Sequence, residues 1–273
     1  MAKTLKQNIN YLDYRDSNLN YIDLAVLIKK ELDSVGYIVI QNFNVDPENV
    51  EDAGQKFLEL SELVGTPISH DGNNKIIWDI KSNFNSKSFV KTYSEHSHEA
   101  ELHTDSQYSF YPEDYFGLLT LKKAQCGGGV SSLLSLKNIL KSLAELENNK
   151  EILEILSSTD YPFIVPNAFK KHKENKVEFN YGPILSENEI RFRVDTFEKA
   201  LEHKEAKCST AQIEAYRVLK EVILNNRYIQ EFYLEPKDLI FINNKTMLHG
   251  RSEFSDEKRH LIRIRMNIDS KQN

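Results

Sequence analysis

Apolar residues along the N-terminal third of the chain alternate between helical spacing and short continuous runs. Helical spacing over residues 22–34 predicts a helix, and the run GYIVIQNF (36–43) predicts a buried strand. Asp46 as an N-cap, with Pro47 at the first helical position, predicts the start of a second helix. The apolar side of that helix consists of Val50, Ala53, Phe57 and Leu60. A further short strand is predicted at KIIWDI (75–80).

The remainder of the chain combines strand-like segments with helical ones. Helical patterns cover residues 134–146 and 150–156, and Ser209 with Gln212 forms a capping box that starts another helix. Strand-like patterns cover 113–124, 161–165, 176–181, 189–195, 238–243, 246–250 and 259–268. Strands therefore dominate the end of the chain, and helices lie before and between them.

This order of elements predicts a mainly β fold with flanking helices, either a β-sandwich or a jelly roll with α/β elements at its N-terminus. A doubly wound α/β fold is disfavoured, because CGGGVS (126–131) follows a strand without the lysine of a phosphate-binding loop. No repeat or linker divides the chain, so one domain over 1–273 is expected. Its core strands fall within about 100–268, with an insert at about 134–230.

Composition narrows the class of protein. A net charge of -6 disfavours a nucleic-acid partner, which would require a basic surface. Two cysteines, Cys126 and Cys208, cannot form a disulfide framework and predict a reducing, cytoplasmic environment. No apolar run approaches the ~20 residues of a membrane span, and the N-terminus lacks the apolar core of a signal peptide. Oligomeric state is left open by the sequence.

His103-Thr104-Asp105 is a candidate metal-binding pair. Side chains two apart in a strand share a face, so one strand can offer an imidazole and a carboxylate to one ion. His249 follows a later strand and can supply a third ligand. Two histidines and one carboxylate leave coordination positions open, which is typical of non-haem Fe(II) oxygenases. Taken alone, His103 could instead be an ordinary surface or core histidine whose hydrogen bonds are satisfied without a metal.

Other motifs place this pair in a wider pattern. LHTDSQYSF, CGGGVS, PKDLIFINNKTMLHGRSEF and RHLIRIR occur in an order and near a spacing that resemble the taurine dioxygenase-like and clavaminate synthase-like enzymes. The resemblance spans roughly residues 35–268. It implies a double-stranded β-helix that couples decarboxylation of 2-oxoglutarate to oxidation of a C–H bond by dioxygen. It also implies that His103, Asp105 and His249 hold Fe(II).

The terminal strand carries Arg259, Arg263 and Arg265 on one face, which predicts an anion site. The resemblance implies that Arg259 binds the distal carboxylate of 2-oxoglutarate, that Arg263 contacts the substrate, and that the Ser131 hydroxyl assists Arg259. The two arginine roles can be exchanged. A solvated edge strand with protective basic residues is the structural alternative. Asn244 matches a family asparagine and is interpreted as a support of the histidine loop.

Glu99 and Glu101 precede His103 at steps of two, so an extended strand would direct them toward the metal. Glu101 could then hold a substrate ammonium group while Arg263 holds a carboxylate, which suggests a free amino acid. The alternative is a polar lid over 94–101 with solvated charges. Asp105 disfavours halogenation, because related halogenases lack the metal carboxylate. Hydroxylation is therefore expected.

Two rival functions remain at this point. A hydrolase could hold zinc at the same three residues and would need neither the arginines nor dioxygen. A jelly-roll binding or sensing module could keep the fold without turnover. The favoured hypothesis is a 2-oxoglutarate-dependent hydroxylase of a small carboxylate-bearing molecule.

Overall fold

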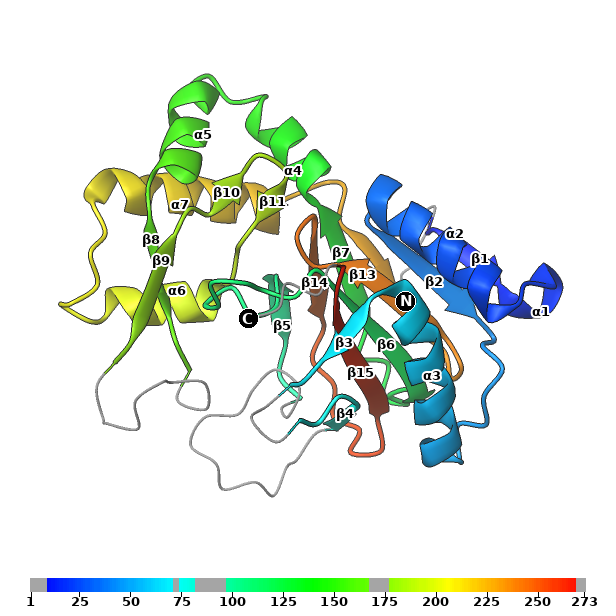
Figure 1. Cartoon of the computed structure of the whole chain (residues 1–273). Helices are drawn as coiled ribbons and strands as arrows, with labels where there is room; N and C mark the ends of the chain where they lie inside the picture. Colours follow the sequence, from blue (N-terminus) through cyan, green and yellow to red (C-terminus); the bar gives the residue numbers. More distant parts are fainter. Residues whose placement is uncertain (1–8, 71–73, 82–96, 167–176, 269–273) are drawn as a thin grey trace.

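The computed structural model describes residues 9–70, 74–81, 97–166 and 177–268, and two facing β-sheets form its centre (Figure 1). The larger sheet has the order β1 (Tyr11–Asp13), β2 (Tyr37–Gln41), β13 (Leu239–Asn243), β6 (Tyr115–Lys122), β15 (His260–Asn267) and β3 (Thr66–Ile68), and β4 (Trp78–Lys81) also pairs with β15. The smaller sheet has the order β12 (Gln230–Phe232), β7 (Ser131–Ser135), β14 (Met247–Arg251) and β5 (Ala100–His103). The prediction of a mainly β fold with flanking helices is confirmed.

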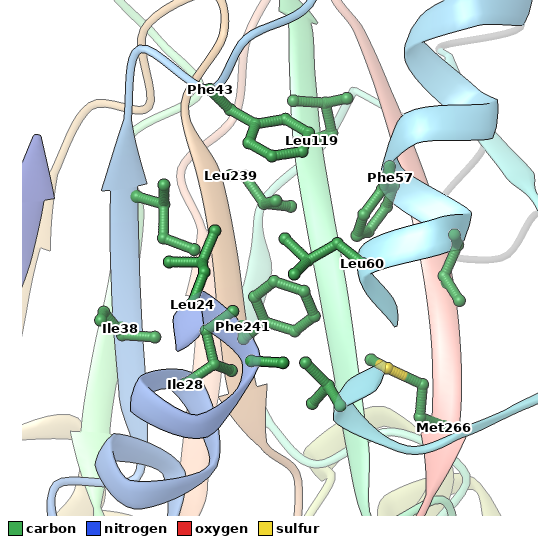
Figure 2. Packing of buried hydrophobic residues seen from close by; sticks show 14 of the residues in the cluster. Leu24, Ile28, Ile38, Phe43, Phe57, Leu60, Leu119, Leu239, Phe241 and Met266 are labelled. Carbon is green, nitrogen blue, oxygen red and sulfur yellow. The ribbon is translucent and has the colours of Figure 1, made fainter. Parts of the chain in front are cut away.

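Alternation along the strands of the larger sheet explains how it packs on both faces. On β13, Leu239 and Phe241 point to the helices, whereas Ile240 and Ile242 point to the smaller sheet. The helices α2 (Tyr21–Ser34) and α3 (Val50–Val64) cover the outer face, and Figure 2 shows their apolar side chains against the strands. The inner face of the larger sheet lines the space between the two sheets.

Helix α3 begins later than the sequence predicts. Its N-cap is Asn49, whose side chain accepts a hydrogen bond from the Asp52 amide, so the prediction of an N-cap at Asp46 is wrong. Asp46 instead closes a turn, since its side chain accepts from the Glu48 amide. Val50 therefore opens the helix and is 41% exposed rather than on its buried side. The short helix α1 (Tyr14–Ser17) and α2 precede this region.

A second apolar core lies in the segment between β7 and β12. This segment contains α4 (Leu136–Leu143), α5 (Asn149–Ser158), β8 (Tyr161–Ile164), β9 (Phe179–Gly182), β10 (Leu185–Ser186), β11 (Glu189–Ile190), α6 (Val194–Leu201) and α7 (Thr210–Leu224). Two sequence predictions were wrong here. Residues 131–135 form β7, so the helix predicted from 134 begins at Leu136. The strand predicted over 189–195 ends at Ile190, because Val194, Phe197 and Ala200 have helical spacing and bury one face of α6.

Strand β15 has neighbours on both sides, so the alternative of a solvated edge strand is wrong. It pairs with β6 along one side and with β3 and β4 along the other. Ile262, Ile264 and Met266 pack under the helices. The opposite residues, including Arg263 and Arg265, therefore face the space between the two sheets.

None of the helices in the described parts of the chain is long and apolar enough to cross a lipid bilayer.

Candidate metal centre

The two histidines of the predicted metal site lie on neighbouring strands of the smaller sheet. His249 is within β14 and is paired directly with His103 at the end of β5. Their rings lie 4.2 Å apart between centroids. Sheet register therefore brings together two side chains that are far apart in the sequence.

Asp105 lies close to these two histidines, but it is not part of a strand. Strand β5 ends at His103, and Asp105 lies in the turn that follows, just before Ser106 with its positive φ of 51°. The assumption that one continuous strand presents both residues was wrong. A turn can present the carboxylate only if its backbone is held in place.

Asn244 holds this turn. The Asp105 amide donates to Asn244 Oδ1 at 2.8 Å, and Asn244 Nδ2 donates to the carbonyl oxygens of Asp105 and Glu113 at 3.1 Å each. Asn244 is buried, and its side-chain oxygen and nitrogen both form hydrogen bonds. It was predicted to support the histidine loop, but its side chain contacts the Asp105 turn instead.

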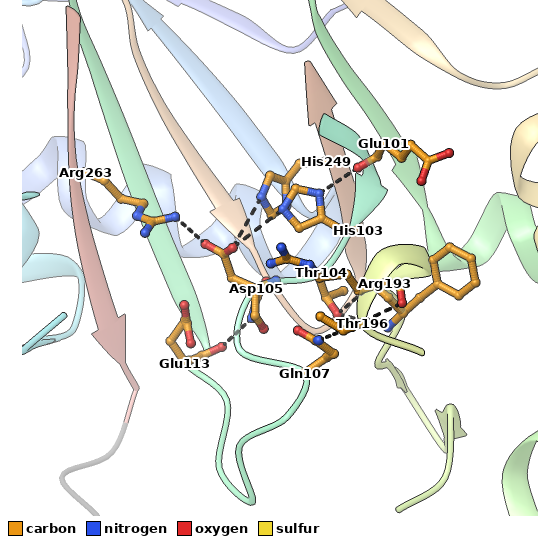
Figure 3. Close-up of polar contacts among 12 residues, drawn as sticks. Glu101, His103, Thr104, Asp105, Gln107, Glu113, Arg193, Thr196, His249 and Arg263 are labelled. Atoms are coloured by element: carbon orange, nitrogen blue, oxygen red, sulfur yellow. Dashed lines mark hydrogen bonds and ion pairs between the residues drawn. The ribbon is translucent and has the colours of Figure 1, made fainter. Parts of the chain in front are cut away.

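The ligand atoms of the three residues converge (Figure 3). Oδ1 of Asp105 lies 3.6 Å from His103 Nε2 and 4.0 Å from His249 Nε2. His103 Nδ1 lies 2.7 Å from the Glu101 carbonyl oxygen, which can only accept, so Nδ1 carries the proton. The Nε2 lone pair of His103 is thereby directed toward Asp105, as a metal ligand requires.

Electrostatics give Asp105 and His249 the protonation states of metal ligands. Burial alone would raise the pKa of Asp105, but the positive charge of Arg263 outweighs burial and holds this pKa well below its ordinary value. Burial and the neighbouring His103 lower the pKa of His249 well below its ordinary range. An ionised carboxylate and a neutral imidazole result. This donor set of two nitrogens and one oxygen fits a divalent ion such as Fe(II) or zinc.

Arg263 and Arg265 lie behind the carboxylate. Nη1 of Arg263 donates to Oδ2 of Asp105 at 2.7 Å, and Arg265 Nη2 is 3.8 Å from the same oxygen. Arg265 Nε is 2.8 Å from Oε1 of the buried Glu113. Arg265 belongs to the arginine face predicted from the sequence, whereas Glu113 was not predicted. Strand alternation accounts for Arg265, but no local signal points to Glu113.

Arg259 occupies a different place from the other two arginines. It lines a pocket with Ser131 and Gly129, and its guanidinium lies 4.9 Å from the ring centroid of Phe254. Burial and nearby Arg251 lower the pKa of Arg259 to about 9, which leaves it charged at neutral pH. It is 7% exposed and forms no ion pair with any carboxylate of the described residues. A buried cation of this kind is ready to receive an anion.

Glu101 contributes its backbone rather than its carboxylate to this centre. Its carbonyl oxygen orients His103, whereas its side chain extends away from the three ligand residues (Figure 3). Burial, opposed by Lys220, raises the pKa of this carboxyl group. Binding of a substrate ammonium group by Glu101 stays a prediction. Residues 94–96 of the alternative polar lid lie outside the described part of the chain.

His70 is a buried residue near the centre that sequence reasoning missed. Its ring stacks on Trp78 with centroids 5.6 Å apart. Burial, Arg263 and Arg265 lower the pKa of His70 to about 2, so the imidazole is neutral. A lone histidine in a loop after β3 gives no sequence signal, because only the register of β3 on β15 brings it near the arginines.

A family model described as taurine catabolism dioxygenase TauD, TfdA family matches residues 4–265. No curated protein matches the chain.

Solved structures share the fold at low sequence identity. Asparagine oxygenase in complex with Fe(II), 2S,3S-3-hydroxyasparagine and succinate has a TM-score of 0.71 and 16% identity, over 90% of this chain and 78% of that one. The non-haem iron oxygenase OrfP with Fe, succinate and (3R,4R)-dihydroxy-L-Arg has a TM-score of 0.68 and 17% identity, over 90% and 81%. PvcB from Pseudomonas aeruginosa has a TM-score of 0.66 and 16% identity, over 96% and 87%. The predicted fold class is confirmed by these likenesses.

Proposed function

Because the chain belongs to the taurine catabolism dioxygenase TauD, TfdA family, we propose that it uses Fe(II), 2-oxoglutarate and dioxygen to oxidise a C–H bond of a small carboxylate-bearing molecule. The observation that carries this proposal is the convergence of His103, Asp105 and His249, accompanied by an Arg259 cation that has no ion-pair partner among the described residues. A free amino acid is the proposed substrate class. Hydroxyasparagine and dihydroxyarginine in the complexes of the structural neighbours support it.

His103, Asp105 and His249 would hold the iron through Nε2, Oδ1 and one imidazole nitrogen respectively. A bound ferrous ion would supply the site at which 2-oxoglutarate and dioxygen generate the oxidant for the substrate C–H bond. Asp105 would offer one oxygen to the ion, because Arg263 engages the other. Its presence in the ligand set favours hydroxylation over halogenation.

Arg259 would neutralise the distal carboxylate of 2-oxoglutarate, with Ser131 beside it in the same pocket. Leu261 and Ala124 are buried on one flank of this pocket and exclude water from that side, which strengthens the pair.

Arg263 is the proposed first contact of the substrate carboxylate. Its Nη1 is engaged with Asp105, whereas its buried Nε has no hydrogen-bond partner among the residues described. The same guanidinium can therefore orient a substrate and hold the metal carboxylate at once. This arrangement would place the substrate next to the ion.

The test is release of succinate from 2-oxoglutarate by the aerobic protein with Fe(II), ascorbate and a panel of free amino acids. The wild-type protein should release succinate, and one or more amino acids should accelerate it and gain the mass of one oxygen atom. The Asp105→Ala protein is the matched control and should do neither. Oxygen-independent turnover with zinc would support a hydrolase instead, and metal binding without any turnover would support a binding module.

A further inference from the structure

The inner face of β6 connects the metal centre to the Arg259 pocket. Phe116, Leu118 and Thr120 alternate onto this face, and the Phe116 ring lies 4.6 Å from that of His249. Thr120 is four residues further along the strand, about 13 Å away at the rise of an extended chain. It pairs across the sheet with Leu261, two residues after Arg259. Thr120 therefore lies on the same face of β6 as Phe116, at the end that lines the Arg259 pocket.

The Thr120 hydroxyl is a buried polar group without a protein partner. Thr120 is 1% exposed, and its Oγ1 has no hydrogen-bond partner among the described residues. Its backbone is satisfied, because its amide donates to the Asp238 carbonyl and its carbonyl accepts from the Lys237 amide. An unpaired hydroxyl in a core costs stability and is uncommon, so it indicates a partner that arrives from outside the chain.

Thr120 and Arg259 line the same pocket. The Arg259 cation has no counter-ion among the described residues, and the Thr120 hydroxyl has no acceptor there. Gly129 lets the backbone approach the Arg259 side chain closely, since a Cβ at this position would lie 3.3 Å from Arg259 Nε. Its φ of 75° also favours glycine over other residues. One carboxylate would satisfy both unmet donors at once.

We infer that Thr120 is a further co-substrate-binding residue, whose hydroxyl donates a hydrogen bond to the distal carboxylate of 2-oxoglutarate beside Arg259. This inference rests on the proposed function. Arg259 supplies the charge, and Thr120 supplies a directed donor from a different strand. Two donors, one from β6 and one from the residue just before β15, fix the orientation of the carboxylate and thereby select co-substrates that carry it.

Thr120→Val tests this inference because valine keeps the shape of threonine and removes only the hydroxyl. The probes are 2-oxoglutarate and 2-oxovalerate, which has the same metal-chelating head and no distal carboxylate. Each is titrated anaerobically into the Mn(II)-loaded full chain by calorimetry and by thermal unfolding. Thr120→Ser is the matched control that restores the donor.

Thr120→Val should weaken 2-oxoglutarate binding by on the order of tenfold, the size expected for one hydrogen bond to a charged acceptor. Binding of 2-oxovalerate should stay unchanged, and Thr120→Ser should bind 2-oxoglutarate like the wild type. Without ligand, the melting temperature of Thr120→Val should equal or exceed that of the wild type, because a buried unpaired hydroxyl is removed.

Equal 2-oxoglutarate affinity of Thr120→Val and wild type would overturn the inference while leaving the proposed function intact. An equal loss for both probes would also overturn it, since that pattern reflects a general distortion of the site. A wild-type protein that binds metal but not 2-oxoglutarate would instead refute the proposed function, and the inference with it.

Discussion

Arg263 donates a 2.7 Å hydrogen bond to the Oδ2 atom of Asp105, whose other oxygen faces His103 and His249. One carboxylate thus joins a buried cation on the larger sheet to the candidate metal ligands on the smaller sheet. Before any metal binds, the Arg263 guanidinium is the main counter-charge of this buried carboxylate. The pair therefore links the stability of the metal-free protein to metal binding.

Replacing Arg263 by methionine should lower the free energy of unfolding of the metal-free protein by about 3–5 kcal/mol, because Asp105 is left buried without its counter-charge. Added Mn(II) should stabilise Arg263→Met more than it stabilises the wild type, since the ion replaces the missing cation. Chemical denaturation with and without Mn(II) measures both quantities. An identical metal increment in the two proteins would contradict this electrostatic link.

Glu113 is expected to be the residue that neutralises Arg265. Glu113→Gln should lower the free energy of unfolding by about 2–4 kcal/mol, because the buried guanidinium loses its nearest anion. Glu48→Gln is the control. It removes an exposed pair with Lys122, in which the Glu48 side chain is 75% exposed, and should change stability by about 0.5 kcal/mol at most. Similar losses for both variants would show that Glu113 has no special role.

Arg259 and Arg263 have separable predicted roles. Arg259→Ala should raise the 2-oxoglutarate concentration needed for half-maximal succinate release by an amount equivalent to about 2–5 kcal/mol, since a carboxylate loses its buried partner. Arg263→Ala should mainly raise the requirement for the amino acid substrate. Steady-state kinetics with each component varied in turn distinguish them. If Arg263→Ala changes only the 2-oxoglutarate constant, the two assignments are exchanged.

Asn244 is expected to control metal affinity without touching the metal. Asn244→Ala removes three hydrogen bonds that hold the backbone at Asp105 and Glu113. The carboxylate then loses its fixed direction, and affinity for Mn(II) should fall by roughly 10–100-fold, the size found for supporting partners of metal ligands. Calorimetric titration measures the effect. Wild-type affinity in a folded Asn244→Ala protein would show that the turn is held by other contacts.

Asp238, which lies outside the metal centre, should make the stability of the protein depend on pH. Burial, opposed by the hydrogen bond from the Glu235 amide, raises the pKa of Asp238 to about 6, above its ordinary value in an unfolded chain. The folded state therefore holds this proton more tightly. The resulting contribution to stability is complete below about pH 4 and is lost as the pH rises through about 6.

Asp238→Asn should remove this dependence. Between pH 4 and pH 7 the wild type should lose on the order of 2 kcal/mol of unfolding free energy relative to the variant. Urea denaturation at the two pH values gives this difference. A difference that is independent of pH would mean that Asp238 titrates normally in the folded protein.

Local pattern was sufficient to predict much of the fold. The helical spacing of residues 22–34 and the capping box at Ser209 and Gln212 correspond to α2 and α7. Alternation also placed Arg263 and Arg265 on one face of the last strand, opposite Ile262 and Ile264. These features depend on residues a few positions apart, so the periodicity of helix and strand determines them.

The sequence by itself determined which residues are candidates for the chemistry: His103 and Asp105 at a spacing of two, His249 on a later strand, and the arginines of the last strand. Tertiary structure alone decided how these groups are held. The pairing of β14 with β5 and β7, the hydrogen bonds of Asn244 to the Asp105 turn, and the burial of Glu113 and Thr120 each join segments distant in the sequence. Such contacts depend on sheet register and on which groups lose water, and neither leaves a periodic signal along the chain.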